Sequence, residues 1–319
     1  MSQINPFLSW DWQWTWWQSF APGHRLHCLV VSQGDRPVAV VPLEESEARP
    51  GVWALGGGTD LSDHLGYLTL DGLELEVAAA VLEALFHDSG GERPAELDLH
   101  YLPGGAPTLE ALRQAAEAAE LKSELAQEEV SPRVELPSSF DDFVAASLGK
   151  RDRHELRRKL RRLSQERPGW RLISHDEMGL EPALDHFFPL LKASGAHKVQ
   201  FLTDEVAGFI RAVCRRLDQR GWLRLQFLEI QGQLAATTLG FTVDRTWNLY
   251  NSGYLPELGA LSPGLICVAE GIRAAIAEGC LVADFLRGNE PYKYHLGAED
   301  RPLWRLRLAA PRDAGTWAG

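Results

Sequence analysis

The segment richest in residues that could do chemistry is 284–297, with the sequence DFLRGNEPYKYHLG. It begins as the end of an apolar strand, becomes charged and flexible, and then places Tyr292, Lys293 and Tyr294 directly after Pro291. Sites in α/β proteins are commonly built where a strand ends and a loop begins. The pattern therefore predicts a functional loop. Its plainer alternative is a polar loop whose tyrosines only pack.

A second candidate is a helix start that could bind an anion. Ser262 and Pro263 have the residue types of an N-cap and a first helical position, and the apolar spacing predicts a helix over 264–278 that Gly279 ends. A glycine beside the free amides lets a ligand approach the backbone, and a helix N-terminus attracts a pyrophosphate. The residues expected to bind such a group are Ser262, Pro263, Gly264 and Leu265.

Both segments lie in a pattern of elements that occurs twice. The offset between the two occurrences is roughly 190 residues. The first consists of strands at 26–32 and 37–43, a helix at 75–86 and a strand at 96–102; the second consists of strands at 223–230 and 234–243, a helix at 264–278 and a strand at 281–286. This predicts an α/β (α+β) fold of two tandem domains, each with a mixed, mostly antiparallel sheet flanked by helices.

The boundary between the two domains is expected near 128–137, where Pro132 and Pro137 interrupt any helix. We therefore expect an N-terminal domain over 1–130 and a C-terminal domain over 131–319. Ser139 is a suitable N-cap for a helix through Leu148. The next segment, 150–167, holds nine Lys or Arg and three acidic residues, with leucines at helical spacing. It predicts a basic amphipathic helix that is either a solvated face or an attractant for an anionic partner.

Composition limits the partners. The net charge of −12 argues against DNA, no apolar run approaches the length of a membrane span, and no secretory signal is recognisable at the N-terminus. The four cysteines lie in apolar stretches and are expected to be buried and reduced, which together with these features favours a cytoplasmic location. The histidines show no zinc-ligand spacing, so no metal is expected.

The tryptophan-rich segment 10–17, WDWQWTWW, is compatible with two structures. Helical spacing puts Trp10, Trp14 and Trp17 on one face, whereas strict alternation would suit a strand. A core-facing helix with some surface indoles is the simpler interpretation. An aromatic groove for a bulky substrate is the alternative.

Several motifs resemble those of a known superfamily. The stretches PFLSWDWQWTWW, PVAVVPL, LGGGTDLSDHLGYL, KRDRHELRRKLRRL and above all ADFLRGNEPYKYHLG look like GNAT acetyltransferases of the type associated with cellulose biosynthesis and biotin synthesis. These are related in turn to the Fem-type aminoacyl transferases. The resemblance spans most of the chain. It implies two tandem GNAT-like domains, the first a degenerate copy, and transfer of an acyl group from acetyl-CoA or another acyl-CoA to an amine by direct attack.

The resemblance also implies roles for individual residues. An alkylamine must lose a proton before it attacks, and a leaving thiolate gains from a proton donor. Tyr292 is the expected acid, with Tyr254 in reserve, and Glu229 or Asp284 the expected base. Lys293 would orient or neutralise an anionic group on the acceptor or cofactor. Arg287, whose guanidinium suits a phosphate or a carboxylate, is expected to bind the cofactor. The residues expected to contact the acceptor are Tyr254, Asn251, Asp60 and His64.

Three functions are compatible with these features. The leading one is an acyl-CoA-dependent N-acyltransferase acting on a small-molecule, sugar or peptide amine. The second is a Fem-type enzyme that takes its aminoacyl group from charged tRNA, which would give the basic helix a role. The third is a catalytically inactive binding module on the same fold.

Overall fold

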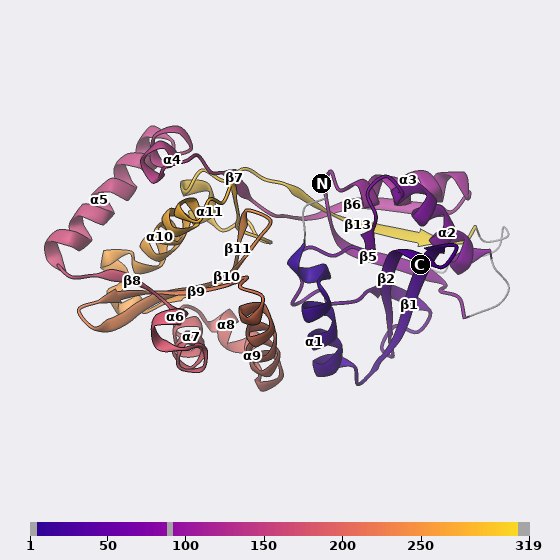
Figure 1. The fold of residues 1–319 in the computed structure, drawn as a ribbon, viewed down its shortest axis with the longest axis horizontal. Coiled ribbons are helices and arrows are strands. Elements are labelled where there is room, and N and C mark those ends of the chain that lie inside the picture. Colours follow the sequence, from indigo (N-terminus) through magenta and orange to yellow (C-terminus); the bar gives the residue numbers. More distant parts are fainter. Residues whose placement is uncertain (1–4, 88–91, 312–319) are drawn as a thin grey trace. The chain divides into compact units, whose positions relative to one another are not determined.

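The computed structural model describes residues 5–87 and 92–311. These residues form two units: an N-terminal unit of residues 5–87 and 92–130 together with 301–311, and a C-terminal unit of residues 131–300. Each unit is a mixed sheet flanked by helices, which confirms the predicted fold class and agrees with tandem GNAT-like domains (Figure 1). Among the described helices, none is long and apolar enough to cross a membrane.

The N-terminal unit contains one sheet with the order β1-β2-β3-β5-β13-β6, and β4 pairs with β2. Its elements are η1 (Pro6–Leu8), α1 (Trp10–Phe20), β1 (His24–Gln33), β2 (Arg36–Ser46), β3 (Val52–Leu55), β4 (Leu68–Thr69), α2 (Glu74–Phe86), β5 (Glu96–Pro103), α3 (Pro107–Ala118), β6 (Lys122–Val130) and β13 (Pro302–Ala309). Helices α2 and α3 bury their apolar faces against the inward leucines of β5 and β13.

The C-terminal unit has the sheet order β7-β12-β11-β10-β9-β8. Its elements are β7 (Arg133–Glu135), α4 (Phe140–Ala146), α5 (Lys150–Glu166), β8 (Arg171–Ser174), α6 (His175–Met178), α7 (Leu180–Ala193), α8 (Ala196–Phe201), α9 (Asp204–Gln219), β9 (Leu223–Ile230), β10 (Gln233–Val243), β11 (Thr246–Tyr254), η2 (Pro256–Leu261), α10 (Pro263–Ala277), β12 (Val282–Asp284) and α11 (Pro291–His295). Helix α10 covers one face of the sheet, and α7 and α9 cover the other (Figure 1).

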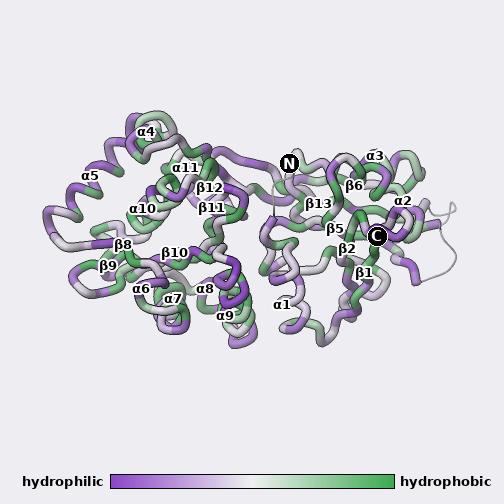
Figure 2. The backbone as a smooth tube through the Cα atoms, viewed as in Figure 1, coloured by the Kyte–Doolittle hydropathy of each residue, from purple (hydrophilic) through white to green (hydrophobic). Residues whose placement is uncertain are grey.

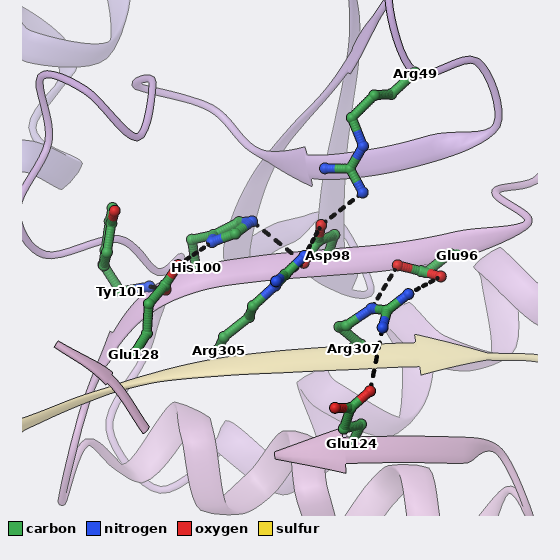
Figure 3. Close-up of polar contacts among 9 residues, drawn as sticks. All are labelled: Arg49, Glu96, Asp98, His100, Tyr101, Glu124, Glu128, Arg305 and Arg307. Atoms are coloured by element: carbon green, nitrogen blue, oxygen red, sulfur yellow. Dashed lines mark hydrogen bonds and ion pairs between the residues drawn. The ribbon is translucent and has the colours of Figure 1, made fainter. Parts of the chain in front are cut away.

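The last strand differs from the sequence prediction. The predicted C-terminal domain, 131–319, includes residues 301–311, yet β13 lies between β5 and β6 in the N-terminal unit. The Arg305 guanidinium donates two hydrogen bonds of 2.7 and 2.8 Å to Asp98 on β5, and Arg307 pairs with Glu96 and Glu124 (Figure 3). This charge match between distant segments fixes the strand, and chain order alone does not reveal it.

The tryptophan-rich segment is the helix α1, and it has both core-facing and surface indoles, as expected. Trp12 and Trp16 are buried, whereas Trp10 is 64% exposed and stacks on Trp14 with 5.1 Å between ring centroids. The Trp12 indole N–H donates to the Ser62 hydroxyl at 2.8 Å. The helix therefore packs into its own unit and leaves a stacked indole pair at the surface.

The cysteines are free, and three of them are buried as predicted. Cys28 is exposed, which corrects the expectation for that residue. It lies on β1, the edge strand of the N-terminal sheet, where alternate side chains face outward.

Candidate functional site

A pocket of about 490 Å³ lies in the C-terminal unit at the start of α10. Both segments that the sequence analysis selected line it: the helix start at Pro263 and the loop and short helix around Tyr292. The other walls come from β11, from α8 and from one side chain of α5. The predicted site residues in its lining are Asn251, Tyr254, Ser262, Pro263, Gly264, Leu265, Arg287, Tyr292 and Lys293.

The geometry of β11 opens this pocket. Its parallel ladder with β12 covers only Thr246–Asn248, while β11 itself continues to Tyr254. A bulge in the pairing with β10 adds Tyr250 as an extra residue between Leu249 and Asn251. Bulges bend a strand and are frequent beside active sites. The pocket follows the part of β11 that lies beyond its ladder with β12.

The start of α10 differs in detail from the predicted serine cap. Ser262 has the left-handed φ and ψ of 56° and 47°, and its side chain makes no capping bond. Its hydroxyl instead accepts a 2.6 Å hydrogen bond from the Lys159 ammonium of α5. Gly264 lies beneath Tyr254, because an added Cβ would approach the Tyr254 ring to 3.1 Å. The helix start therefore carries positive charge from both its amides and a lysine.

The Lys293 side chain is buried, with only 2% of its surface exposed. It supports the loop of residues 286–288, which precedes α11. Its ammonium donates to the backbone carbonyls of Leu286, Arg287 and Gly288 at 3.1, 2.9 and 2.9 Å, and it pairs with Glu290 at 2.9 Å. These contacts occupy all three of its N–H donors. The expected role of Lys293 in orienting a substrate anion is therefore corrected: it holds the loop in shape.

Tyr292 lies edge-on to Phe285 with 6.3 Å between ring centroids, and its hydroxyl is hydrogen-bonded to the Ser252 side chain. Burial raises the pKa of the Tyr292 phenol, and the nearby Glu290 carboxylate raises it further. The phenol thus keeps its proton at neutral pH. Such a group can donate that proton to a stronger base formed in the pocket.

The structure corrects the two predicted bases, because neither lines the pocket. Glu229 is on β9, where its carboxylate accepts a 3.1 Å hydrogen bond from the Arg171 guanidinium. Asp284 is buried at the end of β12 and accepts from the Ser131 hydroxyl at 2.9 Å and from the Leu286 amide at 2.8 Å. These contacts make Asp284 part of the turn that carries the site.

Asp60 and His64 belong to the N-terminal unit and are not among the residues that line the pocket. Asp60 is exposed, and the backbone carbonyl of His64 accepts a 3.0 Å hydrogen bond from the Asn5 amide. Their contact with an acceptor stays a prediction.

Sequence reasoning missed three charged residues of the pocket. Glu290 is the carboxylate in its lining, and Lys159 and Lys198 are ammonium groups that reach it from α5 and α8. Although burial acts in the opposite direction, the Lys293 ammonium lowers the pKa of Glu290 below its ordinary value. Glu290 could have been noticed beside Tyr292 in the sequence. Lys198 is 53 residues from its partner Asn251, so no local signal marks it.

The expectation that no metal binds depends only on the spacing of the histidines in the sequence. Within the described residues, His175, Asp176 and Asp218 bring their ligand atoms within 4.8 Å of one another. The His175 ring lies 2.9 Å from the Asp218 carboxylate, a distance that a histidine–aspartate hydrogen bond accounts for. Asp218 is 43 residues from His175, which is why no motif shows this group.

Comparisons with known proteins relate part of the chain to one family. Residues 150–294 match the family model described as an acetyltransferase (GNAT) domain. The C-terminal unit is similar to GNAT acetyltransferases. The matched residues include α5, β11, α10 and the segment up to Tyr294, so they include every wall of the pocket. No curated protein matches the chain.

Solved structures show the same fold over nearly the whole chain. FemX shares 12% identity with a TM-score of 0.67, covering 96% of this chain and 93% of its own. A conserved protein of unknown function from Bacteroides thetaiotaomicron VPI-5482 shares 14% identity with a TM-score of 0.63, covering 97% and 92%. The structure of L-PGS from Bacillus licheniformis shares 10% identity with a TM-score of 0.55, covering 96% and 93%. At such identities the similarity extends to the fold.

Proposed function

We propose that the C-terminal unit transfers an acyl group from acyl-CoA to an amine. The observation that carries this proposal is the shared pocket: the GNAT-like helix start at Pro263 and the Tyr292 segment line one cavity. The family match supports acyltransferase chemistry, and the use of acetyl-CoA in particular is our proposal. The type associated with cellulose and biotin synthesis, and a cytoplasmic location, are likewise proposals.

The residues present fit a CoA thioester at the helix start. A pyrophosphate there would meet the α10 amides beside Gly264, the Lys159 ammonium and the half-buried Arg287 side chain. Gly264 lets the Tyr254 ring lie directly against the helix start, because an added Cβ would come within 3.1 Å of that ring. The pantetheine arm would then follow β11 toward Tyr292.

The reaction follows from the groups around Tyr292. The acceptor nitrogen attacks the thioester carbonyl carbon, a C–N bond forms and the C–S bond breaks. The proton leaving the amine passes to the Glu290 carboxylate, directly or through water, and the Tyr292 phenol gives its proton to the departing thiolate. The exposed edge of β11 would supply backbone amides to the oxyanion. Glu290 replaces Glu229 and Asp284 in this scheme because it lines the pocket.

Thermal-shift and turnover measurements test the proposal. Acetyl-CoA and longer acyl-CoAs should raise the melting temperature, since they bind the native state. Tyr292→Phe should lower the turnover of wild type by roughly 100-fold or more. Tyr294→Phe is the matched control, because its hydroxyl contacts the exposed Asp300 at 2.7 Å and it does not line the pocket. Equal turnover of wild type and Tyr292→Phe would remove the phenol from the mechanism, and absence of any acyl-CoA shift would refute the proposal.

One observation favours the tRNA-dependent alternative implied by the Fem-type resemblance. A second hollow of about 1380 Å³ follows α5 and shares Lys159 and Leu265 with the pocket. In Figure 2 the tube of α5 is mainly hydrophilic. Several of its cations have neither an ion pair nor a hydrogen bond among the described residues: Lys150, Arg151, Arg157 and Arg161. An unpaired basic surface in a chain of net charge −12 suits a polyanion.

Binding of tRNA distinguishes this alternative. Affinity that falls steeply with salt and weakens in Arg157→Ala and Arg161→Ala would support it. Arg158→Ala is the control on the same helix, because Arg158 already pairs with Glu155 at 2.7 Å. Acyl-CoA binding without salt-sensitive tRNA binding would leave the acyl-CoA reaction as the function.

A further inference from the structure

Lys198 extends from the short helix α8 to the edge of β11, inside the same pocket. Its ammonium donates to the backbone carbonyl of Ser252 and, at 3.4 Å, to the amide oxygen of Asn251. Both acceptors are neutral. Within the described residues no carboxylate lies within ion-pair distance of this ammonium.

The pocket therefore holds more positive than negative charge at this end. Two ammonium groups, those of Lys198 and Lys293, are near a single carboxylate, that of Glu290, and Glu290 pairs with Lys293 at 2.9 Å. Burial lowers the pKa of Lys198 to about 8, with Glu290 and Lys293 acting in opposite directions. His197 is the remaining titratable side chain of α8 in the lining. A desolvated ammonium without a counter-charge is costly, and an anion from a ligand would relieve that cost.

This surplus charge lies beside the proposed reaction centre. Ser252 contacts both groups, through its backbone carbonyl to Lys198 and through its side chain to Tyr292. The helix start, where a pyrophosphate would bind, already has Lys159 at the Ser262 hydroxyl. The two lysines thus serve different parts of the pocket, and the anion for Lys198 must lie near the reacting atoms.

We propose that Lys198 binds a carboxylate that one of the two substrates carries within a few bonds of its reacting group. The carboxylate has two possible sources: the α-carboxylate of an amino acid that accepts the acyl group, or the far carboxylate of a dicarboxylic acyl group such as succinyl. The inference depends on the proposed acyl transfer and assigns to it a substrate class. In either case one charge-assisted hydrogen bond forms between Lys198 and the substrate. We expect it to raise kcat/KM for the carboxylate substrate about 10- to 100-fold over that for its neutral counterpart.

Paired substrates that differ only in this charge test the inference. One arm compares free amino acids with their amides as acceptors of an acetyl group. The other compares succinyl-CoA with acetyl-CoA on a neutral amine. In one of the arms wild type should prefer the carboxylate at least tenfold, Lys198→Met should lose that preference, and Lys198→Arg should restore part of it. Lys192→Met, on the exposed end of α7, is the matched control.

The selectivity ratio separates this role from a structural one. A variant that merely loosened the pocket would lower kcat/KM for both members of a pair by the same factor. Equal loss, or no preference in wild type, would overturn the inference and leave the acyl transfer intact. If no acyl-CoA binds, the proposed function fails, and the inference is then tested by binding alone: glycine or succinate should raise the melting temperature of wild type and not that of Lys198→Met. Equal shifts, or none, would overturn it.

Discussion

In both units two antiparallel strand pairs are followed by one parallel pair, with a helix crossing over between the parallel strands. In the N-terminal unit the parallel strands are β3 and β5, joined through α2. In the C-terminal unit they are β11 and β12, joined through α10. The same connectivity thus occurs in both units, and in the C-terminal unit the pocket follows the first of the two parallel strands. The two units differ in what occupies the space after the first parallel strand, β3 in one unit and β11 in the other.

In the N-terminal unit side chains fill the space after β3. The glycines that follow it run directly under α1: an added Cβ at Gly57 would lie 2.7 Å from the Gln13 amide nitrogen, and one at Gly58 would collide with the Trp16 indole. The Ser62 hydroxyl accepts from Trp12 and donates to the Gly57 carbonyl at 2.7 Å. In the C-terminal unit the corresponding backbone, from β11 to α10, lines the pocket.

The buried charged residues of the two units also differ in what they contact. Asp98 in the N-terminal unit is fully buried and paired with side chains, including Arg49 at 2.8 Å and Arg305 at 2.7 Å (Figure 3). Lys293 in the C-terminal unit is paired mainly with the carbonyls of a loop that borders the pocket. The first charge joins strands, and the second shapes a binding surface. The buried charge of the N-terminal unit therefore serves the packing of its own sheet.

The largest effect is expected from Lys293→Met. The substitution leaves three carbonyls and the Glu290 carboxylate without their shared donor, which costs about 3–5 kcal/mol of unfolding free energy. Urea denaturation should show this loss, and hydrogen exchange should show opening of residues 286–288. Ligand binding in the C-terminal unit should disappear at the same time. Unchanged exchange in this loop would contradict the assigned role, with Lys192→Met again as the surface control.

A smaller effect, on the other unit, is expected from Asp98→Asn. The amide keeps the shape of the carboxylate and loses its charge, so the Arg305 and Arg49 guanidinium groups retain only neutral partners there. We expect about 2–3 kcal/mol of destabilisation, below the cost of deleting a buried partner outright. Any acyl-CoA thermal shift should persist, since the pocket belongs to the C-terminal unit. Loss of ligand binding with the N-terminal unit still folded would contradict the division of roles.

The comparison also shows what local sequence could predict. The paired strands, both crossover helices and the two segments that line the pocket were recognised because hydrophobic periodicity and turn residues are local signals. Strand β13 was assigned to the other domain, because its partner charges on β5 are 207 positions away in the chain. The place of Glu229 near the end of a strand suggests a base. The strand order β11-β10-β9, which separates β9 from the pocket strand β11, is set by long-range pairing and is not visible in the local sequence.

Residue roles were predicted less well than residue positions. Tyr292 and Lys293 both line the pocket, yet the Tyr292 hydroxyl is hydrogen-bonded to the Ser252 side chain and the Lys293 ammonium turns back onto its own loop. That choice is made by the carbonyls of Leu286, Arg287 and Gly288, which converge only after the loop folds. A motif specifies the residues, and the hydrogen bonds that assign their roles come from the tertiary structure.

A third prediction concerns the filled space of the N-terminal unit. Ser62→Ala removes the acceptor for the Trp12 indole and the donor to Gly57, both buried, and should cost about 1–2 kcal/mol. The change should appear in the emission of the buried tryptophans and in faster exchange of residues 56–62. The variant should gain no acyl-CoA binding, because the indoles still occupy the space. Acquisition of a second ligand site would show that one hydrogen bond, rather than the packed indoles, keeps this place closed.

The smallest effect is a pH dependence specific to the N-terminal unit. His100 lies 3.2 Å from Asp98 and 2.6 Å from Glu128 (Figure 3). Although burial alone would lower it, the two carboxylates raise the pKa of His100 above its ordinary value of 6.5. The folded state thus binds this proton more tightly than the unfolded state does. The resulting stability is complete below pH 6.5 and is lost as the pH rises through the raised pKa.

Thermal unfolding between pH 6 and 9 tests this dependence. The transition of the N-terminal unit should fall with rising pH in wild type, and His100→Gln should flatten that slope. Asp98 contributes in the opposite pH range. Although burial alone would raise it, hydrogen bonds from His100, Arg305 and Arg49 together hold the pKa of the Asp98 carboxyl well below its usual value. The stability that the Asp98 carboxylate gives to the fold is therefore lost only as the pH falls below about 4. A slope that persists in His100→Gln would assign the alkaline loss to another group. Since the pocket holds no member of this network, its ligand shift should not follow the His100 titration.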